Sequence, residues 1–194
     1  MMNNQKSRCL PAFLIGAVVM LLLPAGCGRS TGVLELTSYK DAYTPQTYEV
    51  EIEECVYYTE PGGDYHILGR ARYTPDDDPD GEIVQLLHVH LFWKPYPGKT
   101  YDNPTTIDAT LRYAVITARG DTFYSGTGYA YPKKMRRGDD IVLTIEGGRL
   151  APDSQHGEGP EVLGAARILG KMTAKKDHAL AMDLRREIDL RAGR

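Results

Sequence analysis

Three aspartates at alternate positions, followed by a glycine, form the sharpest chemical motif of this sequence. Asp76, Asp78 and Asp80 precede Gly81 in the run Asp-Asp-Asp-Pro-Asp-Gly. Carboxylates at alternate positions can converge on a divalent cation, and the glycine allows the sharp turn of such a loop. The spacing therefore predicts calcium as a candidate cofactor, although Leu87 stands where a closing acid is needed. The alternative is a solvated acidic turn and no cofactor.

Two histidines, His88 and His90, lie two positions apart in an apolar run that is typical of a strand. Side chains at alternate positions of a strand share one face, so both rings could bind one metal ion. A third ligand would come from His66, His156 or a carboxylate. This arrangement defines one hypothesis, a metal-dependent hydrolase. The alternative is that both histidines pack in the core or at a sheet edge with their hydrogen bonds satisfied.

A proline-rich segment from 92 to 104 carries Trp93, Tyr96 and Tyr101. Long loops of compact domains often carry function, and exposed aromatic rings can stack on sugar rings or on a protein partner. These three residues are therefore the predicted contact residues of a binding surface. The alternative is that they cap one end of the hydrophobic core.

The N-terminus has the pattern of an export signal. Lys6 and Arg8 precede a 14-residue apolar stretch over 10–23, which is too short for a permanent transmembrane helix. The following Ala25-Gly26-Cys27 resembles the lipobox of bacterial lipoproteins, with Pro24 as a departure from its pattern. The resemblance implies that the Cys27 thiol receives a diacylglycerol and that palmitate is incorporated. It also implies an exported protein, anchored to the inner or outer membrane of a bacterial cell envelope, in the periplasm or at the cell surface.

The composition is that of a globular protein, with 42% hydrophobic and 25% charged residues among 194. A formal net charge of −3 does not favour nucleic acid as a partner. Three cysteines are too few for a disulfide-rich scaffold. No motif of an activated nucleophile is present, and the acidic neighbours of Cys55 disfavour a reactive thiolate there. We therefore expect a protein that is not an enzyme.

The elements that must position these residues have a period of two. Apolar and polar residues alternate or form short apolar runs between Gly, Pro and Asp turns, which predicts strands near 33–36, 48–58, 65–73, 83–93, 107–115, 123–131 and 141–145. This pattern predicts an all-β fold. An antiparallel β-sandwich of Ig-like architecture is the first expectation, and an open barrel is the alternative.

The predicted organisation has four parts. Residues 1–26 are predicted to be a signal peptide that forms an N-terminal signal helix. Residues 27–45 are predicted to be a lipid-anchored linker with a first strand. The β-sandwich covers 46–150, and 151–194 form a helical C-terminal extension. The extension is predicted from Val162, Ala166 and Leu169 on one helical face, and from a four-residue repeat of apolar side chains at Leu180, Leu184 and Ile188.

Together these features predict an exported, lipid-anchored envelope protein with a non-catalytic binding or assembly role. Its partners would be the membrane, reached through the lipid anchor, and an envelope protein or polysaccharide. A calcium-stabilised, carbohydrate-binding β-sandwich and the metal-dependent hydrolase are the two alternatives.

Overall fold

The computed structural model describes residues 31–75, 81–92 and 107–193, and this part of the chain is predominantly β. Strands occupy all seven predicted positions, because alternating burial is what a pleated sheet imposes on side chains. The elements are β1 (Gly32–Ser38), β2 (Gln46–Ile52), β3 (Glu54–Thr59), β4 (Tyr65–Tyr73), β5 (Ile83–Leu91), β6 (Ala109–Thr117), β7 (Gly120–Gly128), β8 (Ala130–Lys134), β9 (Ile141–Gly157), β10 (Ala166–Lys176) and the helix α1 (His178–Arg191).

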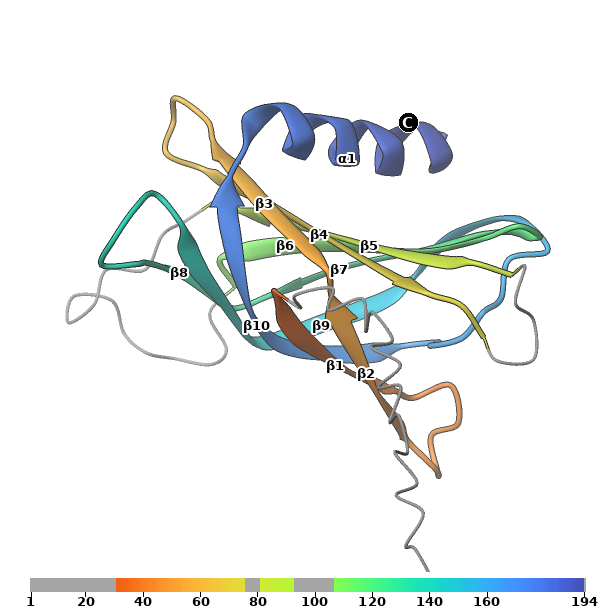
Figure 1. The fold of residues 1–194 in the computed structure, drawn as a ribbon. Helices are drawn as coiled ribbons and strands as arrows, with labels where there is room; N and C mark the ends of the chain where they lie inside the picture. The colour runs from red at the N-terminus through yellow and green to blue at the C-terminus, as the bar shows by residue number, and fades with distance from the viewer. Residues whose placement is uncertain (1–30, 76–80, 93–106, 194) are drawn as a thin grey trace, which may run out of the picture.

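All ten strands belong to one mixed sheet with the order β2-β1-β10-β3-β4-β5-β6-β7-β9-β8 (Figure 1). Neighbours pair antiparallel, except that β10 runs parallel to β3. An additional pairing between β10 and β9 closes seven strands into a ring, in the order β10-β3-β4-β5-β6-β7-β9, and leaves β8 and the β1–β2 hairpin outside it. The all-β class is therefore confirmed, but an Ig-like sandwich of two separate sheets is not.

The expected helical extension over 151–194 is wrong in its first half. Strand β9 runs from Ile141 to Gly157 and so continues through the expected boundary, and 166–176 form β10. Ala166, Ile168, Met172 and Ala174 are buried on one face of β10, which is the period of a strand. Since β10 pairs with β1, β3 and β9, it is a central strand of the sheet, and these pairings decide its conformation.

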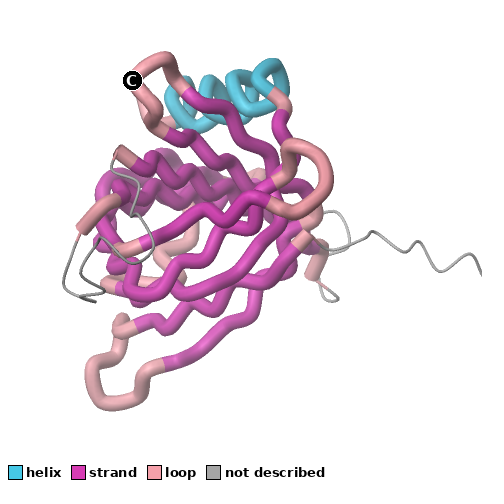
Figure 2. The backbone as a smooth tube through the Cα atoms, turned by 90° about the vertical axis from the view of Figure 1, so that its left-hand side faces the viewer, coloured by secondary structure: helices cyan, strands magenta, loops and turns pink. Residues whose placement is uncertain are grey.

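The second half of the extension is the predicted helix. Helix α1 begins after Asp177, whose side chain accepts a hydrogen bond from the Leu180 amide at 3.1 Å. Leu184 and Ile188 are buried with Ala181 against an apolar patch on the outer face of β3 to β7, formed by Val56, Tyr58, Leu68, Leu86, Ala114, Ile116 and Phe123. Figure 2 shows the helix, in cyan, lying against one side of the strands.

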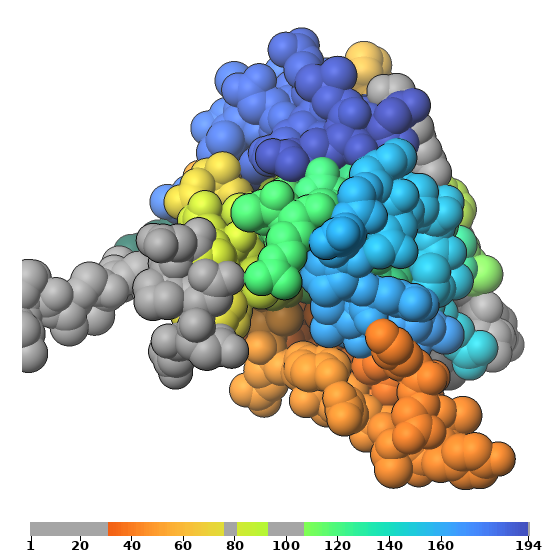
Figure 3. Space-filling view, turned by 90° about the vertical axis from the view of Figure 1, so that its right-hand side faces the viewer, coloured from red at the N-terminus to blue at the C-terminus, as the bar shows by residue number. Residues whose placement is uncertain are grey.

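A second and larger hydrophobic cluster fills the inside of the ring, and it includes Leu34, Leu36 and Ile52 from the β1–β2 hairpin. The hairpin lies on the side of the molecule opposite α1, and in Figure 3 it projects, in orange, from the rest of the body. Both clusters consist of residues between 34 and 188.

Candidate functional site

Most residues that the sequence singled out for binding cannot be placed. The calcium-loop aspartates, the three aromatic contact residues and the lipidation cysteine lie outside the described residues: Asp76, Asp78, Asp80, Trp93, Tyr96, Tyr101 and Cys27. Calcium binding, aromatic stacking and lipidation therefore stay predictions. Cys55 is described, and it is 2% exposed. Burial raises the pKa of its thiol to about 12, so this cysteine is not a reactive thiolate near neutral pH.

The two predicted metal histidines lie on β5 and are joined by His66 of β4. The His66 Nδ1 and His88 Nε2 atoms are 3.1 Å apart, within hydrogen-bond distance. The His66 ring stacks on the His90 ring at a centroid distance of 4.3 Å, and on its other side on Tyr58 at 4.7 Å. His66 and His90 are partners in the β4–β5 register, which is why their rings meet. The structure thus brings His88 and His90 together with His66, one of the residues suggested as a third metal ligand.

The stacked rings of His66 and His90 are not arranged to bind one metal ion together. Parallel rings do not point their nitrogens at a common point, and no group of three or more metal-binding side chains is present in the described ranges. Burial, and next the charge of His66, lower the pKa of His88 to about 3. His90 Nε2 lies 3.1 Å from the Asp64 carboxylate. His156, the other suggested ligand, lies far along the sheet on β9, where its ring contacts Phe123.

The histidine cluster instead forms one edge of the contact between α1 and the sheet. Arg185 of α1 donates a hydrogen bond to the Tyr58 hydroxyl at 2.5 Å and lies 3.7 Å from the Glu60 carboxylate. The same carboxylate lies 3.0 Å from His66 Nε2. Next to this group, Arg112 of β6 donates a hydrogen bond to Asp189 of α1. These polar contacts hold the helix on the sheet, so the cluster has a structural explanation.

The structure also contains a groove that the sequence did not predict. Strands β2 and β3 form one continuous chain that bends at Glu53, where the Glu53 amide donates to the Arg70 carbonyl at 3.0 Å. β3 pairs with β4 only as far as Arg70, because β2 turns away to pair with β1. Beyond that point β2 and the end of β4 diverge. The wedge between them is a cavity of about 800 Å³, within the usual range for ligand sites.

The floor of the groove is mainly apolar. Its lining includes Leu36, Val50, Ala71, Ile83, Val115 and Leu163, contributed by five strands and the segment before β10. One polar pair lies among them, since the buried Tyr113 hydroxyl donates to the Gln85 side chain. The Leu163 amide donates to the Tyr124 hydroxyl at 3.3 Å and its carbonyl accepts from Ser38 at 2.6 Å, so the wall at 160–163 is fixed in place.

The rim of the groove is acidic and aromatic. Glu49, Glu51 and Glu53 line it from the β2 side, and all three are exposed. Arg72 lies on the opposite side and is already 3.7 Å from the Glu82 carboxylate. Tyr48 and Tyr73 flank the opening with exposed fractions of 36% and 54%. The rim therefore favours a ligand that is positively charged and partly apolar.

Sequence reasoning missed this groove because the strand pattern over 48–58 reads as one uninterrupted strand. A local signal is Glu54, which follows Tyr48, Val50 and Ile52 in the alternation and is charged where an apolar residue is expected. Within residues 31–75, 81–92 and 107–193, no helix has the length and apolar character that crossing a membrane requires. No family model, no curated protein and no solved structure matches this chain.

Proposed function

We propose that this protein is a non-catalytic binding module that holds an extended peptide segment of a partner protein in the groove between β2 and β4. The observation that carries this proposal is that two unpaired strand edges face the same apolar groove. Among the described residues, β2 pairs only with β1, and Ala71–Tyr73 of β4 pair only with β5. Their other edges therefore present free backbone amides and carbonyls toward the groove.

An extended peptide is the ligand that such edges recognise. A peptide strand added to β2 would gain main-chain hydrogen bonds, and its alternate side chains would enter the groove. Val50 and Leu36 offer apolar contacts for those side chains, and Tyr48 offers an aromatic one. A small apolar molecule would fill the floor but would leave both strand edges unpaired. The two edges therefore favour a peptide over a small-molecule ligand.

The charge of the rim indicates which residues that peptide carries. The groove is lined by three glutamates against one arginine, which is itself paired with Glu82. Lysine or arginine side chains that point away from the floor would lie beside Glu49 and Glu51. We therefore infer a partner segment in which apolar and basic residues alternate, the pattern of a strand with one buried face.

The experiment that tests this function uses a short synthetic peptide in which valine and lysine alternate, and measures binding by fluorescence anisotropy. We expect saturable binding that is weakened by Glu51→Lys and by Val50→Asp. A peptide alternating valine and glutamate should bind much more weakly. The same valine–lysine peptide with N-methyl groups on alternate residues should fail to bind, because it cannot make the main-chain hydrogen bonds.

Glu35→Lys provides the matched control. Glu35 is an exposed glutamate of the neighbouring strand β1, and it does not line the groove. The control changes the net charge of the hairpin as much as Glu51→Lys does. Because Glu35 lies outside the groove lining, this variant should leave binding nearly unchanged. Equal weakening by both variants, or equal binding of the methylated peptide, would refute strand addition at this edge.

We further propose that the binding module is exported and held on the bacterial envelope by a lipid on Cys27. The support for this is the basic, apolar and Ala-Gly-Cys pattern of residues 1–27. Radiolabelled palmitate should enter the expressed chain and be lost in Cys27→Ser. Labelling that persists in this variant, or an uncut chain in the cytosol, would refute the anchor without affecting the groove.

A further inference from the structure

Two arginines lie directly opposite each other on neighbouring strands of the sheet. Arg149 of β9 and Arg167 of β10 are partners in the antiparallel register, and both are exposed. Side chains at opposed positions share one face of the sheet and start only about 5 Å apart, so like charges there destabilise the pairing. A bound anion would relieve this repulsion.

No ion pair of the described residues relieves that repulsion. In the part of the chain that the structure describes, neither guanidinium has an ion-pair partner, although five other arginines do. The residues next to the pair in the same cross-strand row are Thr37 of β1 and Thr127 of β7. Both are uncharged, so the two positive charges stand together in the row.

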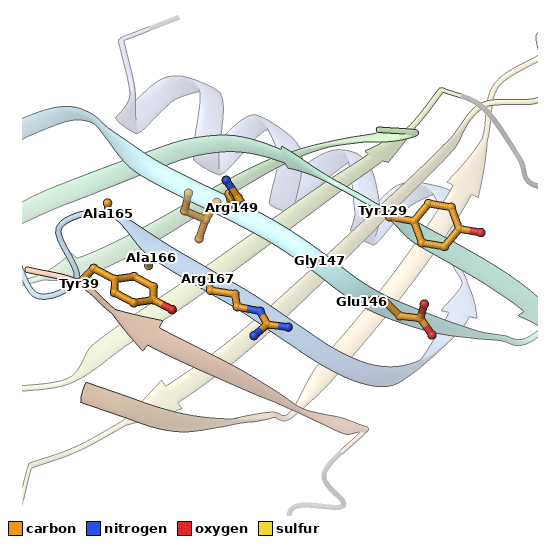
Figure 4. Close-up of a pocket in the computed structure, with 9 residues that line it drawn as sticks. Tyr39, Tyr129, Glu146, Gly147, Arg149, Ala165, Ala166 and Arg167 are labelled. Atoms are coloured by element: carbon orange, nitrogen blue, oxygen red, sulfur yellow. The ribbon is translucent and has the colours of Figure 1, made fainter. Parts of the chain in front are cut away.

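A cavity of about 640 Å³ lies at this arginine pair (Figure 4). Tyr39 enters it from the end of β1, where its amide donates to the Ala165 carbonyl at 2.8 Å, and its ring is 43% exposed. In Figure 4 the Tyr39 hydroxyl points toward Arg167. Glu146 is the one acid in the lining, and its carboxylate accepts a hydrogen bond from Tyr131 at 2.9 Å.

The β-bulge beside the pair keeps this cavity open. The register of β9 and β10 shifts between Ile168 and Gly170, where Glu146 and Gly147 of β9 lie opposite Leu169 of β10. Gly147 lines the cavity with no side chain to fill it. The strands therefore leave room for a ligand next to the guanidinium groups.

We propose that Arg149 and Arg167 bind a phosphate group, with the Tyr39 ring alongside it. Two guanidinium groups match the oxygen pairs of a phosphate, and each can donate two parallel hydrogen bonds to it. The phosphate belongs either to a soluble ligand or to an anionic phospholipid headgroup. This site is separate from the acidic groove and does not depend on the peptide-binding function.

The test uses the full chain, reconstituted in nanodiscs of phosphatidylcholine and titrated with inorganic phosphate. Binding is followed by the NMR signals of the arginine Nε–Hε groups. A second arm replaces part of the lipid by phosphatidylglycerol with no phosphate added. We expect the Arg149 and Arg167 signals to shift in at least one arm, which also identifies the source of the phosphate. Sulfate should compete with phosphate, and chloride at equal ionic strength should not.

Two variants decide whether the pair is the site. Arg149→Gln with Arg167→Gln should weaken phosphate binding about tenfold or more, which corresponds to about 1.4 kcal/mol. The matched control, Arg119→Gln with Arg186→Gln, removes two exposed arginines elsewhere and should leave binding unchanged. Arg167→Lys keeps the charge but loses the paired hydrogen bonds, and should give an intermediate affinity.

Three outcomes would overturn the proposal. The first is that neither phosphate nor phosphatidylglycerol shifts the two arginine signals. The second is that the control pair weakens binding as much as the Arg149 and Arg167 pair, which would mean general attraction to a cationic surface. Since the double variant removes a repulsion, its melting temperature without phosphate should equal or exceed that of the unchanged protein. A folded variant with unchanged phosphate affinity also refutes the site.

Discussion

Protonation of a buried histidine should make the fold sensitive to mild acid. His88 is 6% exposed, and its ring meets His66 on one side of the α1 contact. Burial, the charge of His66 and the nearby Arg185 lower the pKa of His88 to about 3, whereas an unfolded histidine titrates near 6.5. Between these two values the unfolded chain takes up the proton and the folded chain does not. Stability is therefore fully present above about pH 6.5 and is lost as pH falls toward 3.

The size of the effect follows from the span of that window. Each pH unit below 6.5 costs about 1.4 kcal/mol of unfolding free energy for one such group. At about pH 5 the loss assigned to His88 is therefore about 2 kcal/mol, a substantial share of the stability of a small domain. The pKa of His66 is also lowered, by burial first, so it adds a loss of the same sign.

The measurement compares the unchanged protein with His88→Gln by urea unfolding at about pH 7.5 and about pH 5, followed by circular dichroism. Glutamine keeps hydrogen-bonding groups but cannot titrate. We expect the unchanged protein to lose about 2 kcal/mol more than the variant between the two pH values, because groups that do not contact His88 titrate alike in both. His156→Gln, which replaces an exposed histidine, is the control and should behave as the unchanged protein. Equal losses in the protein and in His88→Gln, or an NMR titration placing the His88 pKa near 6.5 in the folded state, would refute the reasoning.

Three other perturbations have defined outcomes. Burial raises the pKa of Asp108 to about 6, and its Oδ1 accepts a hydrogen bond from the Ala130 amide. Above that pH the buried carboxylate is charged, which lowers the stability of the folded protein. Asp108→Asn removes this charge and should stabilise the protein more at about pH 8 than at about pH 5, as measured by urea unfolding. Leu184→Ala should cost about 2–5 kcal/mol by leaving a cavity under α1, and a melting temperature unchanged by this truncation would contradict the described helix packing. Cys55 should react with a thiol reagent only when the chain is unfolded by urea, and rapid labelling of the native protein would show that the residue is not buried.

The strand positions could be predicted because the local pattern and the final environment agree. Each predicted strand contributes one face to the larger hydrophobic cluster, so apolar and polar residues alternate along its sequence. β10 could not be recognised in this way. Val162, Ala166 and Leu169 have the spacing of one helical face and favour a helix, while Gly170 interrupts the buried face of the strand. The residues beside it in β1, β3 and β9, distant in the chain, determine that this segment is a strand.

The amino-acid sequence by itself determined the all-β class, the helix at 178–191 and the pattern of the N-terminal export signal. These depend on the order of apolar, polar and charged residues along short stretches. Only the tertiary structure decided that the sheet closes on itself, that His66 joins His88, and that Arg149 faces Arg167. It also decided that β2 leaves β4 at Glu53 and opens the groove. The physical reason is that strand partners and register are set by contacts between residues far apart in the chain, which no local pattern encodes.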